Sequence, residues 1–237
     1  MNEFQLSKRL ETVASFVPKK SRVADIGSDH AYLPIYLVNQ GVIDFAVAGE
    51  VVKGPFENAK NQIIESGLTE KVIARMASGL NAIEQEDEID VITICGMGGM
   101  LIANILEDGF QEGKLSGKER LILQPNVVEV EVRMWLKNHA YKIVAEEILE
   151  ENEKIYEIIV AEKSSEEVEL SIEEAIFGVE LPKKNSAVFV KKWRQEQKHI
   201  DRIIENLQKA KKPNLSKITE LEGMKKRIEE VLKHAGK

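Results

Sequence analysis

The amino-acid sequence predicts an α/β fold, in which a seven-stranded and mostly parallel sheet is followed by an α-helical hairpin. Three observations lead to this prediction. Strand-like runs alternate with helix-period segments up to Glu162, the last two strands are joined by a short connection, and helices alone follow. Alternating strands and helices form a parallel sheet covered on both faces, because each crossover is right-handed.

Seven short apolar runs are the expected strands, and helix-period segments separate the first six. The runs lie near residues 22–26, 43–49, 72–76, 89–95, 119–124, 141–148 and 155–162. The expected crossover helices cover residues 32–40, 53–66, 80–84, 100–106 and 127–138. A further amphipathic helix precedes the first strand, because apolar residues recur from Leu6 to Val17 at steps of three and four.

The connection between the last two strands, Glu150–Glu153, is too short for a crossover. These strands are therefore expected to form an antiparallel hairpin at the edge of the sheet. Six wound strands with a seventh inserted antiparallel resemble the Rossmann-like fold of class I methyltransferases.

Beyond the sheet the sequence predicts helices only. Ser171 and Glu174 have the spacing of a capping box that opens a short helix. Two long segments follow, 185–210 and 215–234, whose apolar residues recur at steps of three and four on either side of Pro213. This pattern predicts an antiparallel hairpin of coiled-coil type.

Charge is distributed unevenly along the chain. The net charge is −7, but from Lys183 onward 16 Lys and Arg stand against 7 Asp and Glu, which leaves +9 there and −16 before it. An acidic body with a basic tail is typical of a protein that grips a polyanion, although the lysines could equally just solvate helix faces. We expect a catalytic domain over residues 1–165 and a nucleic-acid-binding helical domain over 166–237. The candidate contacts are Lys191, Lys192, Arg194 and Lys198.

Composition describes an ordinary globular protein, with 43% hydrophobic and 31% charged residues. No apolar run approaches the ~18 residues of a membrane span, and the N-terminus does not resemble a signal peptide. We therefore expect a cytoplasmic protein without a membrane partner. The single cysteine, Cys95, cannot form an internal disulfide and is expected to be a buried thiol in a reducing compartment. The four histidines are scattered and no metal-binding motif occurs, so no metal is expected.

The first candidate site begins where an apolar run ends at Asp25. The chain turns at Gly27 and re-enters an apolar pattern after Ser28, Asp29 and His30, which predicts a strand, a tight turn and a helix start. Backbone N–H groups at such a turn can hold an anionic or zwitterionic ligand. The dinucleotide fingerprint requires three glycines and only Gly27 is present, so a smaller nucleoside cofactor with positive charge fits better. S-adenosylmethionine is the candidate.

Two further segments are expected to complete the cofactor site. Glu50 ends the second strand 23 positions after Gly27, where an acidic residue accepts hydrogen bonds from both ribose hydroxyls. The alternative is a strand-end carboxylate in solvent. Ser78 and Gly79 follow the third strand, where such folds border the adenine ring.

Three glycines follow the fourth strand, in the run Cys95-Gly96-Met97-Gly98-Gly99. They allow the backbone to approach a ligand closely, and Gly96 and Met97 are candidate cofactor contacts, although a tight turn alone would also use glycine. Ligands of open parallel sheets bind outside the carboxyl ends of the strands, near the switch in strand order. The first and fourth strands flank that switch, so both glycine turns are expected to face one crevice.

The fifth strand ends in Leu123-Gln124-Pro125-Asn126. Gln124 and Asn126 carry paired donors and acceptors that could read the Watson–Crick edge of an adenine. A polar strand end that caps the next helix is an equally good explanation. The Asn-Pro-Pro-Tyr run of DNA amino methyltransferases is absent after the fourth strand, which favours attack by a ring nitrogen over methylation of an exocyclic amine.

Three motifs, taken together in this order, resemble one known family. The segments 25–34, 94–99 and 123–126, followed by the helical tail, are similar to the bacterial tRNA adenine-N1 methyltransferases known as TrmK. The resemblance extends over nearly the whole chain. It implies transfer of a methyl group from S-adenosylmethionine to N1 of adenine 22 in the D-loop of tRNA. It also implies a Rossmann-like catalytic domain and a helical domain that helps to hold the tRNA.

The expected chemistry rests on alignment. Adenine N1 has an in-plane lone pair and no proton to lose, so positioning against the methyl group could supply ~7–11 kcal/mol. The methylated base is a cation, and Asp29 is the candidate for stabilising its developing charge, unless it caps the helix or binds the cofactor. N1 is paired in a duplex, so the base must be flipped out.

Other functions stay open at this point. They are a small-molecule or other RNA methyltransferase, a nicotinamide-dependent oxidoreductase, and a non-catalytic RNA-binding module that dimerises through its hairpin. We expect a monomer or a weak homodimer.

Overall fold

The computed structural model describes residues 5–184, 186–210, 212 and 214–234. The chain forms two compact units, and each contains two separate segments. The first unit comprises Met1–Glu147 and Tyr156–Leu170, and the second comprises Ile148–Ile155 and Ser171–Lys237. The tip of the last strand pair therefore belongs with the helical segment, which the sequence pattern does not indicate. The predicted catalytic and tRNA-binding roles of the two parts stay predictions.

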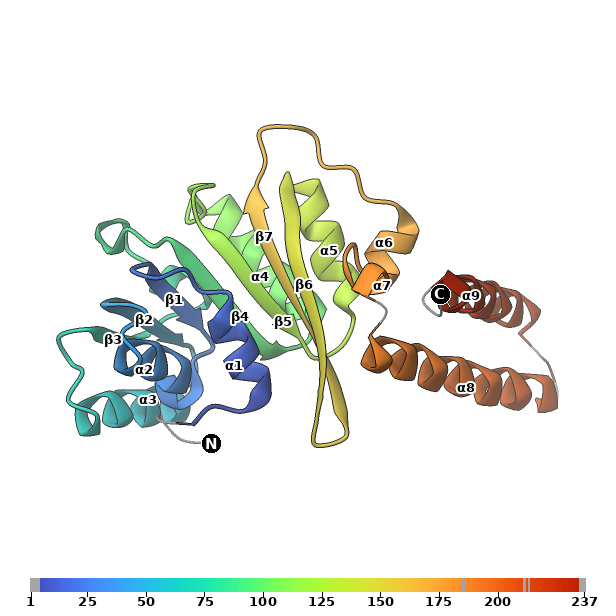
Figure 1. Ribbon diagram of the computed structural model, residues 1–237, viewed down its shortest axis with the longest axis horizontal. Coiled ribbons are helices and arrows are strands. Elements are labelled where there is room, and N and C mark those ends of the chain that lie inside the picture. Colours follow the sequence, from blue (N-terminus) through green and yellow to red (C-terminus); the bar gives the residue numbers. More distant parts are fainter. Residues whose placement is uncertain (1–4, 185, 211, 213, 235–237) are drawn as a thin grey trace. The chain divides into compact units, whose positions relative to one another are not determined.

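The first unit is built on a seven-stranded sheet with helices on both faces (Figure 1). The strand order is β3-β2-β1-β4-β5-β7-β6, and β7 runs antiparallel to β5. This confirms the predicted α/β class and the antiparallel insertion of the last strand. The strands are β1 (Arg22–Ile26), β2 (Phe45–Glu50), β3 (Val72–Met76), β4 (Val91–Met97), β5 (Arg120–Pro125), β6 (Tyr141–Glu151) and β7 (Lys154–Lys163).

The helices of the first unit follow the predicted alternation, with two differences. The predicted helix at 80–84 is only a 3-10 turn, and the predicted helix at 100–106 extends to Gln111. The α-helices are α1 (Lys8–Ser15), α2 (Tyr32–Asn39), α3 (Lys53–Glu65), α4 (Gly99–Gln111) and α5 (Glu129–Asn138). The 3-10 helices are η1 (Asp29–Ala31), η2 (Gly79–Ala82) and η3 (Gln85–Asp87).

The central strands are buried on both faces, which explains why they read as continuous apolar runs. Leu121, Ile122 and Leu123 of β5 are all fully buried.

The first unit also contains a buried ion-pair network, in which the Arg133 guanidinium is 2.7 Å from Glu146 and 2.6 Å from Glu157. All three side chains are inaccessible to solvent, so loss of the arginine would leave two buried carboxylates uncompensated. This network anchors α5 to the last two strands.

The hairpin between β6 and β7 closes through a tighter turn than the expected connection 150–153. Only Asn152 and Glu153 separate the strands, and both have left-handed backbone angles, with φ of 50° and 63°. A two-residue turn of this kind matches the natural twist of the strands.

The second unit contains helices α6 (Ile172–Phe177), α7 (Leu181–Lys184), α8 (Ala187–Lys209) and α9 (Leu215–His234). The predicted capping box is present, because the Ser171 hydroxyl accepts from the Glu174 N–H and the Glu174 carboxylate accepts from the Ser171 N–H. Helices α8 and α9 are antiparallel: Gln197 donates to Glu229, and Lys225 donates to Asp201. The coiled-coil character of this pair stays a prediction.

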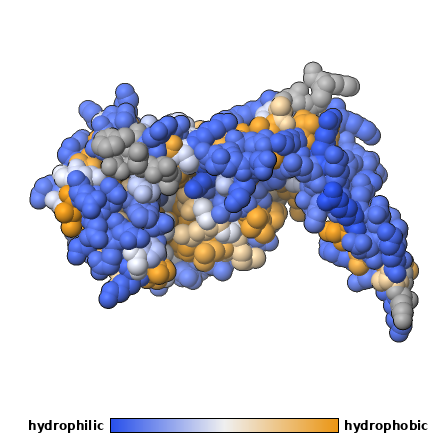
Figure 2. Space-filling view, turned by 90° about the horizontal axis from the view of Figure 1, so that it is seen from below, coloured by the Kyte–Doolittle hydropathy of each residue, from blue (hydrophilic) through white to orange (hydrophobic). Residues whose placement is uncertain are grey.

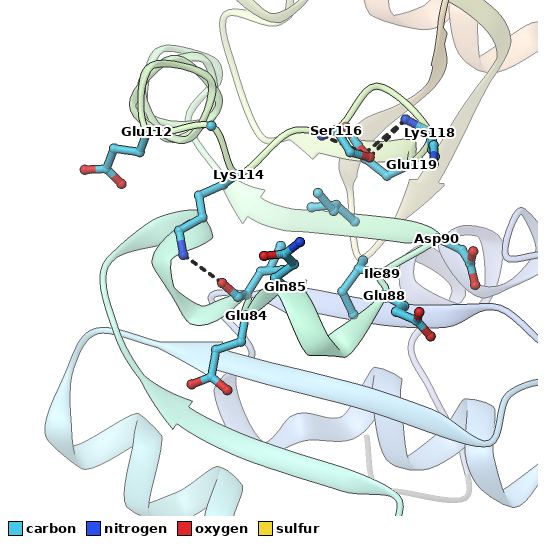
Figure 3. Close-up of a pocket in the computed structure, with 13 residues that line it drawn as sticks. Glu84, Gln85, Glu88, Ile89, Asp90, Glu112, Lys114, Ser116, Lys118 and Glu119 are labelled. Atoms are coloured by element: carbon cyan, nitrogen blue, oxygen red, sulfur yellow. Dashed lines mark hydrogen bonds between the residues drawn. The ribbon is translucent and has the colours of Figure 1, made fainter.

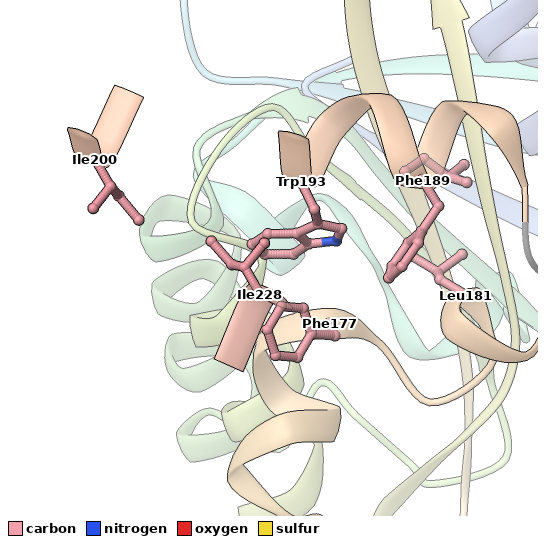
Figure 4. Packing of buried hydrophobic residues seen from close by; sticks show 7 residues of the cluster. Phe177, Leu181, Phe189, Trp193, Ile200 and Ile228 are labelled. Atoms are coloured by element: carbon pink, nitrogen blue, oxygen red, sulfur yellow. The ribbon is translucent and has the colours of Figure 1, made fainter. Parts of the chain in front are cut away.

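The core of the second unit combines residues from its two chain segments (Figure 4). Its buried members are Ile148, Phe177, Leu181, Phe189, Trp193, Ile200 and Ile228. Phe177 packs edge-on against Trp193, with ring centroids 4.5 Å apart. Ile148 comes from the β6–β7 hairpin, so the strands contribute apolar surface that the helices of this unit cover.

Across the described residues, no helix has both the length and the apolar character that a membrane crossing would need.

Candidate active site

The carboxyl ends of β1 and β4 lie next to each other in the sheet. Ile26 pairs with Ile94 in parallel register, so the two glycine turns leave neighbouring strand ends. This confirms that the switch in strand order lies between these two strands. The two glycine turns therefore lie side by side, and the crevice between them stays a prediction.

The first turn places Gly27 at a φ of +75°, a conformation that side chains rarely adopt. A Cβ at Gly27 would lie 2.0 Å from the Met97 methyl carbon, the flexible end of that side chain, so the backbone conformation rather than space favours glycine here. The Gly27 and Ser28 N–H groups both donate to Gly49, at 2.8 and 3.0 Å, and the Asp29 N–H donates to Gly27. The Gly27, Ser28 and Asp29 N–H groups are therefore already used by the protein backbone, and the expected binding of ligand by N–H groups of this turn stays a prediction.

The chain enters α2 through two consecutive left-handed residues. His30 and Ala31 have φ of 60° and 50°. The His30 ring stacks on Tyr32 with centroids 5.1 Å apart, and its Nε2 lies 3.6 Å from the Asp29 carboxylate. The Asp29 side chain is 64% exposed. Asp29 and His30 therefore stand at the solvent side of the turn rather than inside it.

Asp25 is the buried carboxylate of this site. Its Oδ1 accepts a 2.6 Å hydrogen bond from the hydroxyl of Thr93, a β4 residue that the sequence analysis did not single out. Burial raises the pKa of Asp25 above its ordinary value, and the nearby Ser28 and Thr93 hydroxyls and the positive charge of Arg9 oppose this rise. The nearby Ser28 hydroxyl is also buried, and within the described residues it has no hydrogen-bond partner. An unpartnered buried hydroxyl is costly, so a ligand that bonds to Ser28 would stabilise the turn.

Glu50 ends β2 with its side chain fixed in place. One carboxylate oxygen accepts hydrogen bonds from the Val51 and Val52 N–H groups, at 2.8 and 2.9 Å. The side chain is mostly buried, and no hydrogen bond to its second oxygen is found among the described residues. That oxygen is therefore available to accept from ribose hydroxyls.

Ser78 and Gly79 lie close to Glu50 in the sheet. The last residue of β3, Met76, pairs with Glu50 in register, and the Ala77 N–H donates to the Glu50 carbonyl. Ser78 is the N-cap residue of η2, and Gly79 is left-handed. The structure thus places these two residues beside the end of β2, and their contact with a cofactor stays a prediction.

Hydrogen bonds join the ends of β4 and β5. The Gly96 N–H donates to the Gln124 side-chain oxygen at 3.0 Å, and the Gln124 amide donates to Asn126 at 3.1 Å. Asn126 closes the loop by donating to the Gly96 carbonyl at 2.7 Å. Gln124 is fully buried and uses both ends of its carboxamide, so this geometry gives it a bracing role. Its predicted role in reading the base would require these bonds to break, because its oxygen also accepts from Arg9 and its amide also donates to the Pro125 carbonyl. Asn126 uses both ends of its carboxamide too, but it is exposed, and one N–H and one oxygen lone pair are left for a ligand.

Arg9 of α1 reaches this network and was missed by the sequence analysis. Its guanidinium donates to the Gln124 side-chain oxygen and lies 5.4 Å from the ring centroid of Tyr156. In the sequence Arg9 is one polar residue of an amphipathic helix, and no neighbouring residue indicates that it bonds to Gln124.

Cys95 differs from its expectation: it is half-buried instead of fully buried, and burial raises the pKa of its thiol.

Comparison with known proteins agrees with this geometry. Residues 23–233 match the family model TrmK, described as tRNA (adenine(22)-N(1))-methyltransferase. The chain belongs to this family. The tRNA (adenine(22)-N(1))-methyltransferase of Bacillus subtilis is 45% identical over 240 residues, which cover 99% of this chain and 100% of that protein.

Solved structures of TrmK proteins have the same fold. A Streptococcus pneumoniae protein, solved with S-adenosyl-L-methionine, is 47% identical with a TM-score of 0.88, covering 96% of this chain and 100% of that one. TrmK of M. capricolum, solved with S-adenosyl-homocysteine, is 28% identical with a TM-score of 0.84, covering 97% and 99%. This TrmK chain is therefore an S-adenosylmethionine-dependent tRNA methyltransferase. The unpartnered Ser28 hydroxyl and the available Glu50 oxygen fit that cofactor.

The predicted tRNA contacts of this TrmK lie on α8. Lys191, Arg194 and Lys198 recur at steps of three and four and are exposed, so they share one helix face. Lys191 forms an ion pair with Glu150 at 2.5 Å, and Lys192 lies 5.4 Å from the Trp193 ring centroid. Arg194 and Lys198 have no ion-pair partner within the described residues, so they are the more available cations.

A pocket of about 720 Å³ lies at the opposite ends of the strands, near the amino ends of β4 and β5 (Figure 3). None of the predicted site residues lines it. Its acidic members include Glu119, whose carboxylate already accepts from Ser116 and Tyr141. Among the described residues, no group of three His, Cys, Asp or Glu side chains is placed to hold a metal ion.

Proposed function

We propose that the crevice at the carboxyl ends of β1 and β4 methylates N1 of adenine 22 in tRNA. The observation that carries this proposal is that the candidate cofactor residues and the candidate base-binding residue lie at the ends of neighbouring strands. Asp25, Ser28 and Glu50 are buried polar residues at the ends of β1 and β2, suited to a nucleoside cofactor, and Asn126 is exposed directly after β5.

The cofactor residues divide into three functions. Glu50 binds the ribose hydroxyls with the oxygen that its own backbone does not use. Ser28 donates or accepts at the amino-acid end of the cofactor, and Gly27 and Gly96 allow close approach. Ser78 and Gly79 border the adenine ring of the cofactor. Bound S-adenosylmethionine supplies an electrophilic methyl group on a sulfonium.

The remaining residues act on the target base. Asn126 holds the Watson–Crick edge of the flipped adenine, and Gln124 braces Asn126 from behind through its 3.1 Å hydrogen bond. Because N1 has no proton to lose, no general base is required. Asp29 lies at the solvent side of the crevice and stabilises the positive charge that develops on the methylated base. Positioning is therefore the main contribution of this chain.

We further propose that the basic face of α8, defined by Lys191, Arg194 and Lys198, binds tRNA phosphates, with Lys192 beside it. The second unit would then serve as the RNA-binding part of the enzyme. The protein acts in the cytoplasm without a metal ion, as a monomer or a weak homodimer.

Transfer of labelled methyl groups to tRNA transcripts tests this proposal. A transcript with adenine at position 22 should yield 1-methyladenosine on nucleoside analysis, and a matched transcript with guanine there should yield none. Equal labelling of both transcripts would overturn the assignment of the target base. Labelling of small molecules but not of tRNA would instead support a small-molecule methyltransferase.

A further inference from the structure

Exposed apolar side chains gather where β4 and β5 end. Met100 and Leu101 are each 52% exposed, Val127 is 58% exposed and Val128 is 46% exposed. Figure 2 shows areas of apolar surface among the hydrophilic ones on the face seen from below. Large apolar side chains grouped in water mark a binding surface more often than a solvated one.

Val128 has an unusual backbone. Its φ of 60° and ψ of 46° are left-handed, and a β-branched residue rarely adopts this conformation. It is the N-cap residue of α5 but makes no side-chain capping hydrogen bond, so capping does not explain the residue type. Glycine or asparagine would fit this position with less strain. Strained residues of this kind concentrate at sites of ligand contact.

The surroundings hold Val128 in this conformation. The Asn126 N–H donates to Met97 at 2.7 Å, and the Gly99 N–H donates to Val127 at 2.8 Å. A Cβ at Gly99 would lie only 2.1 Å from the Val128 carbonyl oxygen, so glycine is required for the two turns to approach so closely. Backbone hydrogen bonds therefore hold the turns after β4 and β5 together.

We propose that Val128, with Val127 beside it, is the apolar platform on which the ring of the target adenine rests during methyl transfer. This inference rests on the proposed function. A flipped base loses its stacking partners, and its N1 must come to the carboxyl ends of β1 and β4. Asn126, which reads the edge of the base, directly precedes the two valines. A base whose edge is bound by Asn126 turns one apolar face toward Val127 and Val128. The hydrogen-bonded turns hold these two valines in place before the base binds, so little conformational entropy is lost on binding.

The Val128→Gly variant tests this inference, because glycine adopts the left-handed conformation without steric cost. We expect its melting temperature to equal or exceed that of wild type and its affinity for S-adenosylhomocysteine to be unchanged. Its kcat/KM for tRNA should fall about tenfold or more, as for other lost aliphatic contacts. Val128→Asn, which also tolerates this conformation, should show the same pattern. Val144→Ala on β6, where Val144 is 42% exposed, is the matched control and should match wild type in all three measurements.

Several outcomes would overturn the inference. Full kcat/KM in Val128→Gly would show that the side chain does not contact the base. An equal loss of S-adenosylhomocysteine affinity would place Val128 in the cofactor site instead. A change in sedimentation of the variant would indicate that a second copy of the chain covers these valines. A wild-type protein that fails to methylate tRNA would overturn the proposed function as a whole, which distinguishes that failure from this one.

Discussion

The guanidinium of Arg9 donates a hydrogen bond to the buried carboxamide of Gln124, which lies 115 residues further along the chain. The same carboxamide oxygen accepts from the Gly96 N–H, and the amide nitrogen donates to Asn126. Arg9 therefore fixes which end of the Gln124 carboxamide faces which partner. A residue outside the sheet thus orients the proposed base-reading asparagine without touching the base itself.

Replacing this arginine should slow methyl transfer. Arg9→Met removes a charged donor to a buried acceptor, a contribution of roughly 1.5–3 kcal/mol, so kcat should fall about tenfold to a hundredfold. Affinity for S-adenosylhomocysteine should change much less, because Arg9 touches the base-reading side. Kinetics and calorimetry measure the two effects. Lys19→Met, which also replaces a cation by methionine but at an exposed position, is the control. Equal losses in kcat and affinity would argue against a positioning role for Arg9.

The ionised Asp25 carboxylate should lower the stability of the folded protein, although it contributes to cofactor binding. Burial raises its pKa above 3.8, so the folded state holds this proton more tightly than the unfolded chain does. Stability is therefore lost as pH rises from 3.8 through the raised pKa, and it stays lower at neutral pH. Asp25→Asn cannot ionise and should melt at a higher temperature than wild type at pH 7, with the difference shrinking in acid. The variant should also bind S-adenosylhomocysteine more weakly, and a variant less stable than wild type at pH 7 would contradict this account.

Glu50→Gln isolates the ribose contact. The glutamine oxygen can still accept from the Val51 and Val52 N–H groups, but its amide nitrogen cannot accept from a ribose hydroxyl. Loss of charge-assisted hydrogen bonds worth roughly 1.5–3 kcal/mol should weaken S-adenosylhomocysteine binding about tenfold to a hundredfold by calorimetry. Glu57→Gln, at an exposed position of α3, should bind normally. Unchanged affinity in Glu50→Gln would remove Glu50 from the cofactor site.

Asp29→Asn should reduce turnover more than cofactor affinity. The substitution keeps the shape of the side chain and removes its charge beside the developing cation. Because this carboxylate is 64% exposed, water screens it and the loss in kcat should be modest, roughly threefold to tenfold. Single-turnover kinetics would measure the chemical step directly. If affinity falls in parallel with turnover, Asp29 is a cofactor residue and not a catalytic one.

Charge reversal on α8 should weaken tRNA binding. Arg194→Glu with Lys198→Glu removes two exposed cations without disturbing the Lys191–Glu150 ion pair. Each lost phosphate contact should lower the slope of log affinity against log salt by roughly 0.7–0.9. Binding titrations at several salt concentrations measure this slope, and Lys60→Glu on α3 is the control. An unchanged slope would leave this face as solvated surface.

These reversals are a better test than removal of the helical segment. A chain cut after Ser165 would keep every strand, but it would expose Ile148 and Ile155 of the β6–β7 hairpin, which pack in the core of the second unit. Reduced stability of such a fragment would then be confused with loss of RNA contacts.

Much of this protein could be read from its sequence because the signals are local. Alternating apolar runs and helix-period segments predicted the sheet and its crossovers, and the short connection before Lys154 predicted the antiparallel hairpin. Gly27 and Glu50 could be named as candidates because a tight turn and a strand-end carboxylate each occupy a few consecutive residues. Patterns of this length are set by backbone geometry and side-chain periodicity.

The tertiary structure alone decided which groups are already satisfied. The Gly27 and Ser28 N–H groups were expected to bind ligand, but the Gly49 carbonyl of the neighbouring strand accepts them. The hydrogen bond from Arg9 to Gln124 could not be predicted from the sequence. These outcomes depend on which strands and helices lie side by side, so residues far apart in the chain compete for the same donors and acceptors. A single sequence records the donors and acceptors, but only the folded arrangement settles how they pair.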